Sequence, residues 1–348
     1  MKRLAITTAV TIVLLLGSEA GLRAWAFFFR HPYQRLDARS GMIRLVPNVE
    51  TLRQGRRIAV NSLGFRGHEF SPKKPAGVVR IVALGDSVTF GEPGEACPYP
   101  AQLERLLNAG PSGRKFEVIN AGVEGYNSRD ALWLLQHEVL QYQPDLVTVL
   151  IGWNDLVKHD PGRPDASAVT STFAYDLYDV YLIKAWRKVV FAYLRPLVLS
   201  VDTRRLPEAE ARAYRTYVPY VFQHNLEQMI GLANQHHAHV VLFTLPSPLD
   251  PQMGEEDIKK LYWPSYTYNL EKFFTVYSRY NETIRAVGRK TGVPVLDLAR
   301  QLRGRGDLFN DTAHPTCDGA GVVAAEISRF LQIPGVIESP DQPLGSRD

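Results

Sequence analysis

Four short segments of the chain carry residue types that could together perform acyl transfer. They hold Ser87 in Gly-Asp-Ser, Gly125 in a glycine-containing turn, Asn154 in Trp-Asn-Asp, and Asp311 three residues before His314. A serine hydroxyl becomes a nucleophile when a neighbouring base takes its proton, and a histidine oriented by a carboxylate is such a base. N–H groups aimed at the carbonyl oxygen stabilise the charge that develops there. The residue types therefore point to a serine-dependent reaction at an acyl carbon.

These types predict a role for each residue. Ser87 is the nucleophile, His314 is the general base and then the general acid, and Asp311 orients the imidazole. The predicted oxyanion donors are the backbone N–H groups of Ser87 and Gly125 and the side-chain amide of Asn154.

The residues can act together only if the fold brings the segments to one place. Short, continuous apolar runs bounded by polar or Gly residues predict strands buried on both faces, here 78–84, 116–119, 146–151, 239–245 and 293–296. Amphipathic stretches alternate with them and predict helices over 99–107, 128–142, 221–236, 277–291 and 319–331. This alternation indicates an α/β fold, a parallel sheet with helices on both faces. Ligands bind at the carboxyl ends of such strands, where all four segments lie.

Each motif alone is weak, but the ordered set, with each motif just past a predicted strand, resembles the SGNH hydrolases, the GDSL esterase/lipase superfamily. Ser87, Gly125, Asn154 and His314 match the four residues that name the family, over roughly residues 79–332. Asp311 matches the triad acid and is preferred to Asp297 on family spacing. The resemblance implies a three-layer α/β/α, flavodoxin-like fold with about five strands. It also implies ester hydrolysis without a metal or other cofactor.

Four further residues in these segments are predicted to support the site. Asp86 and Asp155 should shape their turns through hydrogen bonds to neighbouring backbone. Trp153 should line the pocket, and Asn120 should brace the loop that carries Gly125.

The N-terminus predicts export. Lys2 and Arg3 precede an apolar run of 14 residues from Leu4 to Gly17, shorter than the roughly 20 residues that span a bilayer. The run fits a cleaved signal peptide or, extended through residue 29, a signal anchor with an aromatic belt, which we favour. We expect a membrane-anchored protein that faces the extracytoplasmic side, or a secreted one if the signal is cleaved.

The domain organisation follows from these segments. We expect a signal segment over 1–29, an N-terminal extension over 30–77, the SGNH hydrolase domain over 78–333 and a flexible tail over 334–348. The extension should contain strands within 42–46 and 57–60 and end in a linker over 71–77. Residues 156–236 should form a helical insertion after the third strand, acting as a cap or a membrane-facing flap. The arginines of the extension are expected on a solvated surface: Arg53, Arg56, Arg57 and Arg66.

Two cysteines remain to be placed. In an oxidising compartment Cys97 and Cys317 can pair. If the triad forms, both lie in loops at the same edge of the sheet. We therefore predict a disulfide that braces the rim of the active site.

Composition excludes several classes of protein. The 40 Lys and Arg against 36 Asp and Glu leave a net charge of +4, too balanced for a chain that coats nucleic acid. Two cysteines rule out a four-cysteine zinc site, and no glycine-rich phosphate loop is present.

The sequence favours an esterase or lipase-like acylhydrolase acting on an O-acyl ester, O-acetyl esters included, of a small molecule, a glycan or a lipid. An O-acyltransferase of the same fold that modifies a polysaccharide would use the same residues. A catalytically idle carbohydrate- or partner-binding protein is the third alternative. The oligomeric state stays open.

Overall fold

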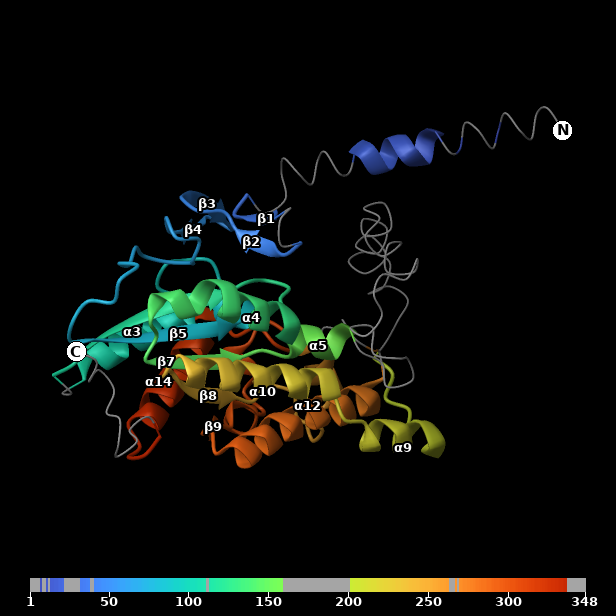
Figure 1. The fold of residues 1–348 in the computed structure, drawn as a ribbon. Coiled ribbons are helices and arrows are strands. Elements are labelled where there is room, and N and C mark those ends of the chain that lie inside the picture. The colour runs from blue at the N-terminus through green and yellow to red at the C-terminus, as the bar shows by residue number, and fades with distance from the viewer. Residues whose placement is uncertain are drawn as a thin grey trace.

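Five parallel strands form the central sheet of the computed structural model (Figure 1). The strands are β5 (Val78–Gly85), β6 (Lys115–Gly122), β7 (Leu146–Leu150), β8 (His239–Phe243) and β9 (Val295–Leu296). Their spatial order is β6-β5-β7-β8-β9, so the first strand lies between the second and the third. This is the flavodoxin-like order, and the fold expected from the sequence is confirmed.

The structure describes Thr7, Thr11 and residues 13–21, 32–37, 41–110, 113–158, 201–262, 267 and 269–336. Much of the expected signal segment, residues 159–200 of the expected insertion and most of the tail (337–348) lie outside these residues. Within the described ranges, no helix is long and apolar enough to cross a membrane.

Helices cover both faces of the sheet (Figure 1). On one face, α3 (Tyr99–Ala109) packs against α14 (Cys317–Leu331), and on the other α4 (Ser128–Leu134), α10 (Tyr220–Gln235) and α12 (Leu270–Thr291) lie side by side. Although α10 falls within the segment expected to be an insertion, it packs on β8 and is a crossover helix of the sheet. The shorter helices are α2 (Ser87–Phe90), α5 (Trp153–Lys158), α9 (Glu208–Thr216), α11 (Glu255–Leu261) and α13 (Leu298–Gln301), with a π-helical turn over 135–139 and 3-10 turns over 140–142 and 306–308.

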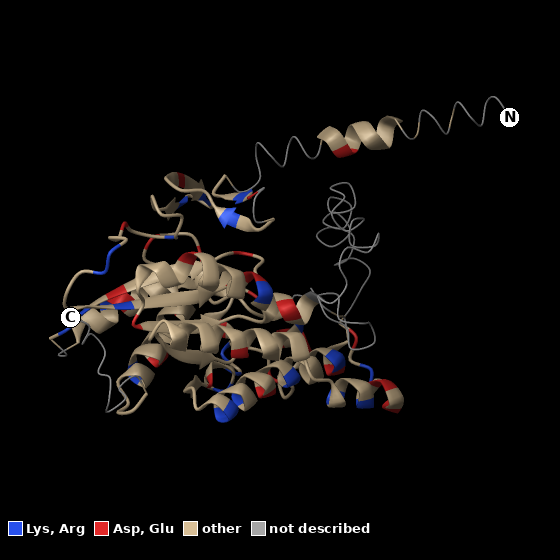
Figure 2. Cartoon of the chain, in the orientation of Figure 1, with Lys and Arg blue, Asp and Glu red and all other residues tan. Residues whose placement is uncertain are grey.

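The strands are continuous apolar runs because helices shield both of their faces from water. All eight residues of β5 and all five of β7 are buried. Figure 2 shows charged residues mainly on the outer helices and loops, with few on the central strands.

Arg80 is the one charged residue within β5, and it is completely buried. Its guanidinium donates to the Glu117 carboxylate at 2.6 Å, the Tyr142 carbonyl at 2.7 Å and the Ser71 carbonyl at 2.7 Å. A buried charge is tolerated when it is paired and its donors are satisfied. These bonds tie the start of the expected linker 71–77 to the sheet.

The N-terminal extension consists of two antiparallel hairpins. The first pairs β1 (Gln34–Leu36) with β2 (Ile43–Leu45), and the second pairs β3 (Val49–Arg53) with β4 (Arg56–Val60). The sequence predicted β2 and β4 but missed β1 and β3, whose side chains are exposed or half-buried and carry no continuous apolar signal. Isolated bridges join Arg66 to Val60 and to Asn120, so the extension meets the sheet at β6.

Candidate active site

Ser87 lies at the first turn after the central strand. Asp86 caps α2, its carboxylate accepting from the Val88 N–H at 3.0 Å, and Ser87 begins the helix. The helix can sit this close to the sheet because β6 ends in glycine. A Cβ on Gly122 would lie 2.2 Å from the Phe90 nitrogen, a distance that no side chain tolerates. The sequence thus places a half-exposed serine at the carboxyl edge of the sheet.

A chain of hydrogen bonds joins Ser87, His314 and Asp311. Ser87 Oγ lies 2.9 Å from His314 Nε2, and His314 Nδ1 lies 2.9 Å from Asp311 Oδ2 and 3.0 Å from Oδ1. The loop itself holds the carboxylate in place, because the backbone N–H groups of Ala313 and His314 both donate to Asp311 Oδ1, at 2.8 and 2.9 Å. The structure therefore brings together three residues that the sequence separates by up to 227 positions.

The carboxylate sets the proton affinity of the imidazole. Burial opposes the charged form of His314, but the hydrogen bond and the charge of Asp311 outweigh it, so the pKa of His314 is raised. Burial likewise opposes the charge of Asp311, yet the bonds from His314 and Ala313 leave the pKa of that carboxyl lowered. The pair can thus receive a proton on Nε2 while Asp311 stays ionised.

The three predicted N–H donors follow neighbouring strands of the sheet. The backbone N–H of Ser87 and that of Gly125 have no hydrogen-bond acceptor within the described part of the chain. Asn154 donates one amide hydrogen to the Tyr126 carbonyl at 2.8 Å, which leaves its second amide hydrogen for a ligand. Gly125 has a φ of +86°, in the left-handed region that favours glycine, and a Cβ there would face open space. The three donors follow β5, β6 and β7, which are neighbours in the sheet.

Two of the predicted supporting residues, Asp155 and Asn120, form hydrogen bonds with segments that are more distant in the sequence than expected. Asp155 accepts from the backbone N–H and the hydroxyl of Ser128, at 2.8 and 2.5 Å, and so joins α5 to the start of α4. Asn120 donates to the Thr89 carbonyl at 3.0 Å and accepts from the Gly122 N–H at 2.9 Å, bracing α2 rather than Gly125 directly.

Trp153 is buried and stacks on Tyr277 of α12, with ring centroids 5.5 Å apart, so its ring packs α5 against α12. Its predicted place in the wall of the pocket stays a prediction. Asp297, the competing acid, binds Arg285 and the Thr244 hydroxyl and is not part of the Ser87–His314 chain of bonds. Asp297 and Arg285 help to line a cavity of about 480 Å³ beside α12, and neither Ser87 nor His314 lines it.

The buried carboxyl of Asp86 should make the stability of the protein depend on pH. Burial raises the pKa of its carboxyl to about 7, and one of its oxygens has no hydrogen-bond partner among the described residues. Because the folded state holds this proton more tightly than the unfolded state, the stability that Asp86 contributes is present at low pH and is lost as pH rises towards 7. We therefore expect the unfolding free energy of Asp86→Asn, measured relative to wild type, to rise by roughly 2–4 kcal/mol as the pH increases from 4 to 7. Above pH 7 the difference should stay constant. Urea unfolding measures the rise, and a difference that is already constant below pH 7 would contradict the prediction.

Cys97 and Cys317 form a disulfide in the structure. Their Cα atoms are 4.7 Å apart, and Gln102 of α3 donates to both backbone carbonyls at 2.9 Å. Cys317 begins α14, three residues after His314, and Cys97 lies in the loop between α2 and α3. The bond therefore ties the loop that follows the serine to the element that follows the histidine.

This disulfide closes a long loop, with 220 positions between its ends. Because cross-linking distant residues restricts the unfolded chain, we expect the double variant Cys97→Ala/Cys317→Ala to lose about 2–5 kcal/mol of unfolding free energy. Denaturant unfolding checks this, and a reductant should weaken the wild type while leaving the variant unchanged. Equal stability of the two proteins, or alkylation of both cysteines without reduction, would contradict it.

One expectation for the extension is wrong. Arg66 was expected on a solvated surface, but it is only 5% exposed. Its guanidinium donates to the backbone carbonyls of Phe90, the last residue of α2, and of Gly91 and Glu92, which follow it. Burial lowers its pKa to about 10. The only available signal was its turn-rich surroundings, Asn61 to Gly67, which do not reveal a distant partner.

The central domain is similar in sequence to known proteins. Residues 83–322 match the profile of the GDSL-like lipase/acylhydrolase family. A curated relative, the uncharacterized lipoprotein YqeF of Bacillus subtilis (strain 168), is 32% identical over 110 residues, which are 31% of this chain and 43% of that protein, so the match spans less than half of its length.

Solved structures with a related arrangement include a lipase/acylhydrolase from Enterococcus faecalis (21% identity, 72% of this chain and 93% of that chain covered, TM-score 0.42). Another is Axe2, an acetylxylan esterase from Geobacillus stearothermophilus (16% identity, 73% and 94% covered, TM-score 0.43).

Proposed function

Because this chain belongs to the GDSL-like lipase/acylhydrolase family, we propose that it is a serine esterase whose nucleophile is Ser87. The observation that carries the proposal is the continuous chain of hydrogen bonds from Asp311 through His314 to Ser87 Oγ. A serine in this setting can transfer its proton as it attacks, which is the step that an isolated hydroxyl performs poorly at neutral pH.

The proposed reaction has two halves. Ser87 Oγ attacks the ester carbonyl while its proton passes to His314 Nε2, and the resulting oxyanion accepts hydrogen bonds from Ser87, Gly125 and Asn154. The tetrahedral intermediate collapses, His314 returns the proton to the departing alkoxide, and an acyl-enzyme and an alcohol result. Water then attacks the acyl-enzyme with His314 again as base, and a carboxylic acid leaves as Ser87 is restored.

We place the substrate among O-acyl esters, O-acetyl esters included, carried by a sugar, a lipid or a small alcohol. The open space at Gly125 and the half-exposed serine leave room for a substrate at the edge of the sheet. An extracytoplasmic location fits the disulfide, because such bonds persist in oxidising compartments. The membrane-anchored form remains part of this proposal.

Covalent labelling tests the proposal directly. A fluorophosphonate probe reacts with a serine whose hydroxyl is activated and whose oxyanion site is assembled. We expect one label per folded molecule, which peptide mass analysis assigns to Ser87, and none after denaturation. Ser328→Ala is the matched control, because this buried serine of α14 accepts from the Gln332 side chain at 3.3 Å, away from the triad loop, and should leave labelling unchanged. Absence of label, or label on another residue, would overturn the proposal.

A further inference from the structure

Tyr33, in the N-terminal extension, lies between two loops of the proposed active site. Its ring stacks on Phe90, with centroids 5.4 Å apart and planes at 14°, and Phe90 is the last residue of the helix that begins with Ser87. Its hydroxyl donates to Glu124 Oε2 at 2.8 Å, and Glu124 directly precedes Gly125. Tyr33 is only 2% exposed. A single side chain therefore contacts both elements that carry the backbone oxyanion donors.

Arg53 of β3 completes this contact. Its guanidinium donates to Glu124 Oε1 at 2.8 Å and to the Tyr33 hydroxyl at 3.3 Å, so both carboxylate oxygens of Glu124 are held. Burial and the neighbouring Glu124 raise the pKa of Tyr33 to about 12, which keeps the phenol protonated as a donor. Charge-assisted bonds of this kind are stronger than neutral ones. The side chain of Glu124 is consequently fixed from two points of the extension, the residue before β1 and the last residue of β3.

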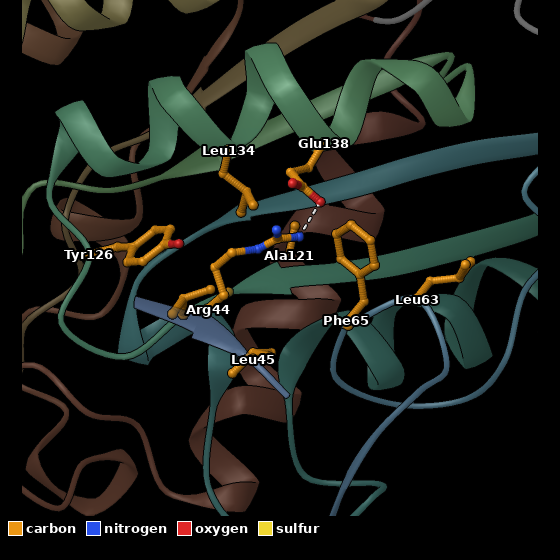
Figure 3. A pocket seen from close by; sticks show the side chains of 11 residues that line it. Arg44, Leu45, Leu63, Phe65, Ala121, Tyr126, Leu134 and Glu138 are labelled. Atoms are coloured by element: carbon orange, nitrogen blue, oxygen red, sulfur yellow. Dashed lines mark hydrogen bonds and ion pairs between the residues drawn. The ribbon is translucent and has the colours of Figure 1, made fainter. Parts of the chain in front are cut away.

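The extension also holds the residue on the other side of Gly125. The Tyr126 hydroxyl donates to the Ile43 carbonyl at 2.5 Å, while the Tyr126 carbonyl accepts from Asn154. Figure 3 shows Arg44 of β2 reaching Glu138, 2.5 Å away, beside Tyr126. The cavity left between these elements measures about 20 Å³, room for a single water molecule. The first hairpin thus packs closely against the loop.

Gly125 lies in a turn that one backbone hydrogen bond closes, from the Tyr126 N–H to the Val123 carbonyl at 3.2 Å. Gly125 has no side chain, it is exposed, and its own N–H has no acceptor in the described part of the chain. A glycine with a positive φ is also intrinsically free to rotate. The direction of its N–H therefore depends on the neighbouring residues Glu124 and Tyr126, and both of these are bound by the extension.

We propose that the N-terminal extension is a positioning element of the active site, in which Tyr33 and Arg53 act through Glu124 to aim the Gly125 N–H at the oxyanion. This inference rests on the proposed esterase function and adds to it two residues that precede the family domain at 83–322. Tyr33 and Arg53 are positioning residues, since neither touches the reacting atoms.

The inference predicts which kinetic constant changes. The negative charge on the oxygen is absent from the bound ester and develops on the way to the tetrahedral intermediate, so a misaligned donor lowers kcat and leaves KM nearly unchanged. Complete removal of one such donor costs about 10²–10³ in kcat, so misalignment should cost roughly 10-fold. Because both side chains act through the same carboxylate, their effects should not add.

The test compares Tyr33→Phe, which keeps the stack on Phe90, with Arg53→Gln, the double variant and Arg53→Lys. The matched control is Tyr214→Phe on α9, whose hydroxyl also lies near a glutamate, 3.4 Å from Glu210 Oε1. Each protein is assayed with an activated acetyl ester and with the fluorophosphonate probe, and its thermal unfolding is recorded. The Arg53 side chain is 44% exposed, so Arg53→Gln should fold even if Tyr33→Phe does not, and it then tests the inference alone.

We expect Tyr33→Phe and Arg53→Gln each to lower kcat and the rate of labelling roughly 10-fold, with KM within about twofold and labelling still complete at its end point. The kcat of the double variant should equal that of the less active single variant. Arg53→Lys should keep most of the wild-type kcat, and the kcat of Tyr214→Phe should equal that of wild type. Wild-type rates in both single variants, or a loss confined to thermal stability or KM, would overturn the inference while leaving the esterase intact. Failure of the wild type itself to label would instead overturn the proposed function.

Discussion

Ser87→Ala is expected to lower kcat by about 10⁶, to the level of the uncatalysed reaction plus whatever binding and the oxyanion donors supply. The hydroxyl is the atom that forms the acyl-enzyme, so no other group in the site can substitute for it. The fold should survive, because Asp86 rather than Ser87 caps α2 and the serine side chain bonds only to His314 among the described residues. Steady-state hydrolysis of an activated ester measures the loss.

The same variant separates catalysis from binding. Since the alanine removes one oxygen and leaves the donors in place, KM or the affinity for a product should change little. Circular dichroism and denaturant unfolding establish that the variant is folded. Turnover within about tenfold of wild type would show that Ser87 is not the nucleophile, because loss of a triad serine costs orders of magnitude more.

Asp311→Asn is expected to lower kcat by about 10⁴. The amide is the same size as the carboxylate, but it cannot stabilise the imidazolium of His314 and it favours the wrong tautomer. The acidic limb of the pH–rate profile should also move. Asp311 raises the pKa of His314, so its removal lowers that pKa and lets the base stay neutral at lower pH. Steady-state rates as a function of pH record both changes.

Asp297→Asn is the matched control for this variant. Asp297 is also a carboxylate bound to a basic side chain, Arg285, through bonds of 3.1 and 3.0 Å, but it is not bonded to His314. Its substitution should leave kcat and the pH–rate profile at wild-type values and should cost some stability. If Asp297→Asn alone abolished turnover, the acid of the triad would be Asp297, and if the two variants behaved alike, the assignment of Asp311 would be contradicted.

The positions of the strands and the motifs at their ends were predictable from the sequence. Buried parallel strands are short apolar runs, and all five predicted strands agree with the structure to within three residues at each end; β9 starts two residues later than predicted, at Val295, after Pro294. Proline cannot donate in a strand ladder, which explains that shortening. The start of α12 was missed: Asn269 caps the helix at Leu270, and its first turns already bury Leu270, Phe273 and Val276 at helical spacing.

By itself, then, the sequence determined which residue types stand at the carboxyl ends of the strands, and from them the chemistry that they could perform. Only the tertiary structure decided which of these residues meet and what holds them. The contact between Ser87 and His314 depends on strand order, and the burial of Arg66 depends on carbonyls that lie 24 to 26 positions away. Tyr33 shows the same limit, since its partner Glu124 is 91 positions distant and no local pattern marks the pair. The local hydrophobic pattern indicates only which helix or strand a residue belongs to. Contacts between helices, strands and loops follow from the topology of the whole sheet.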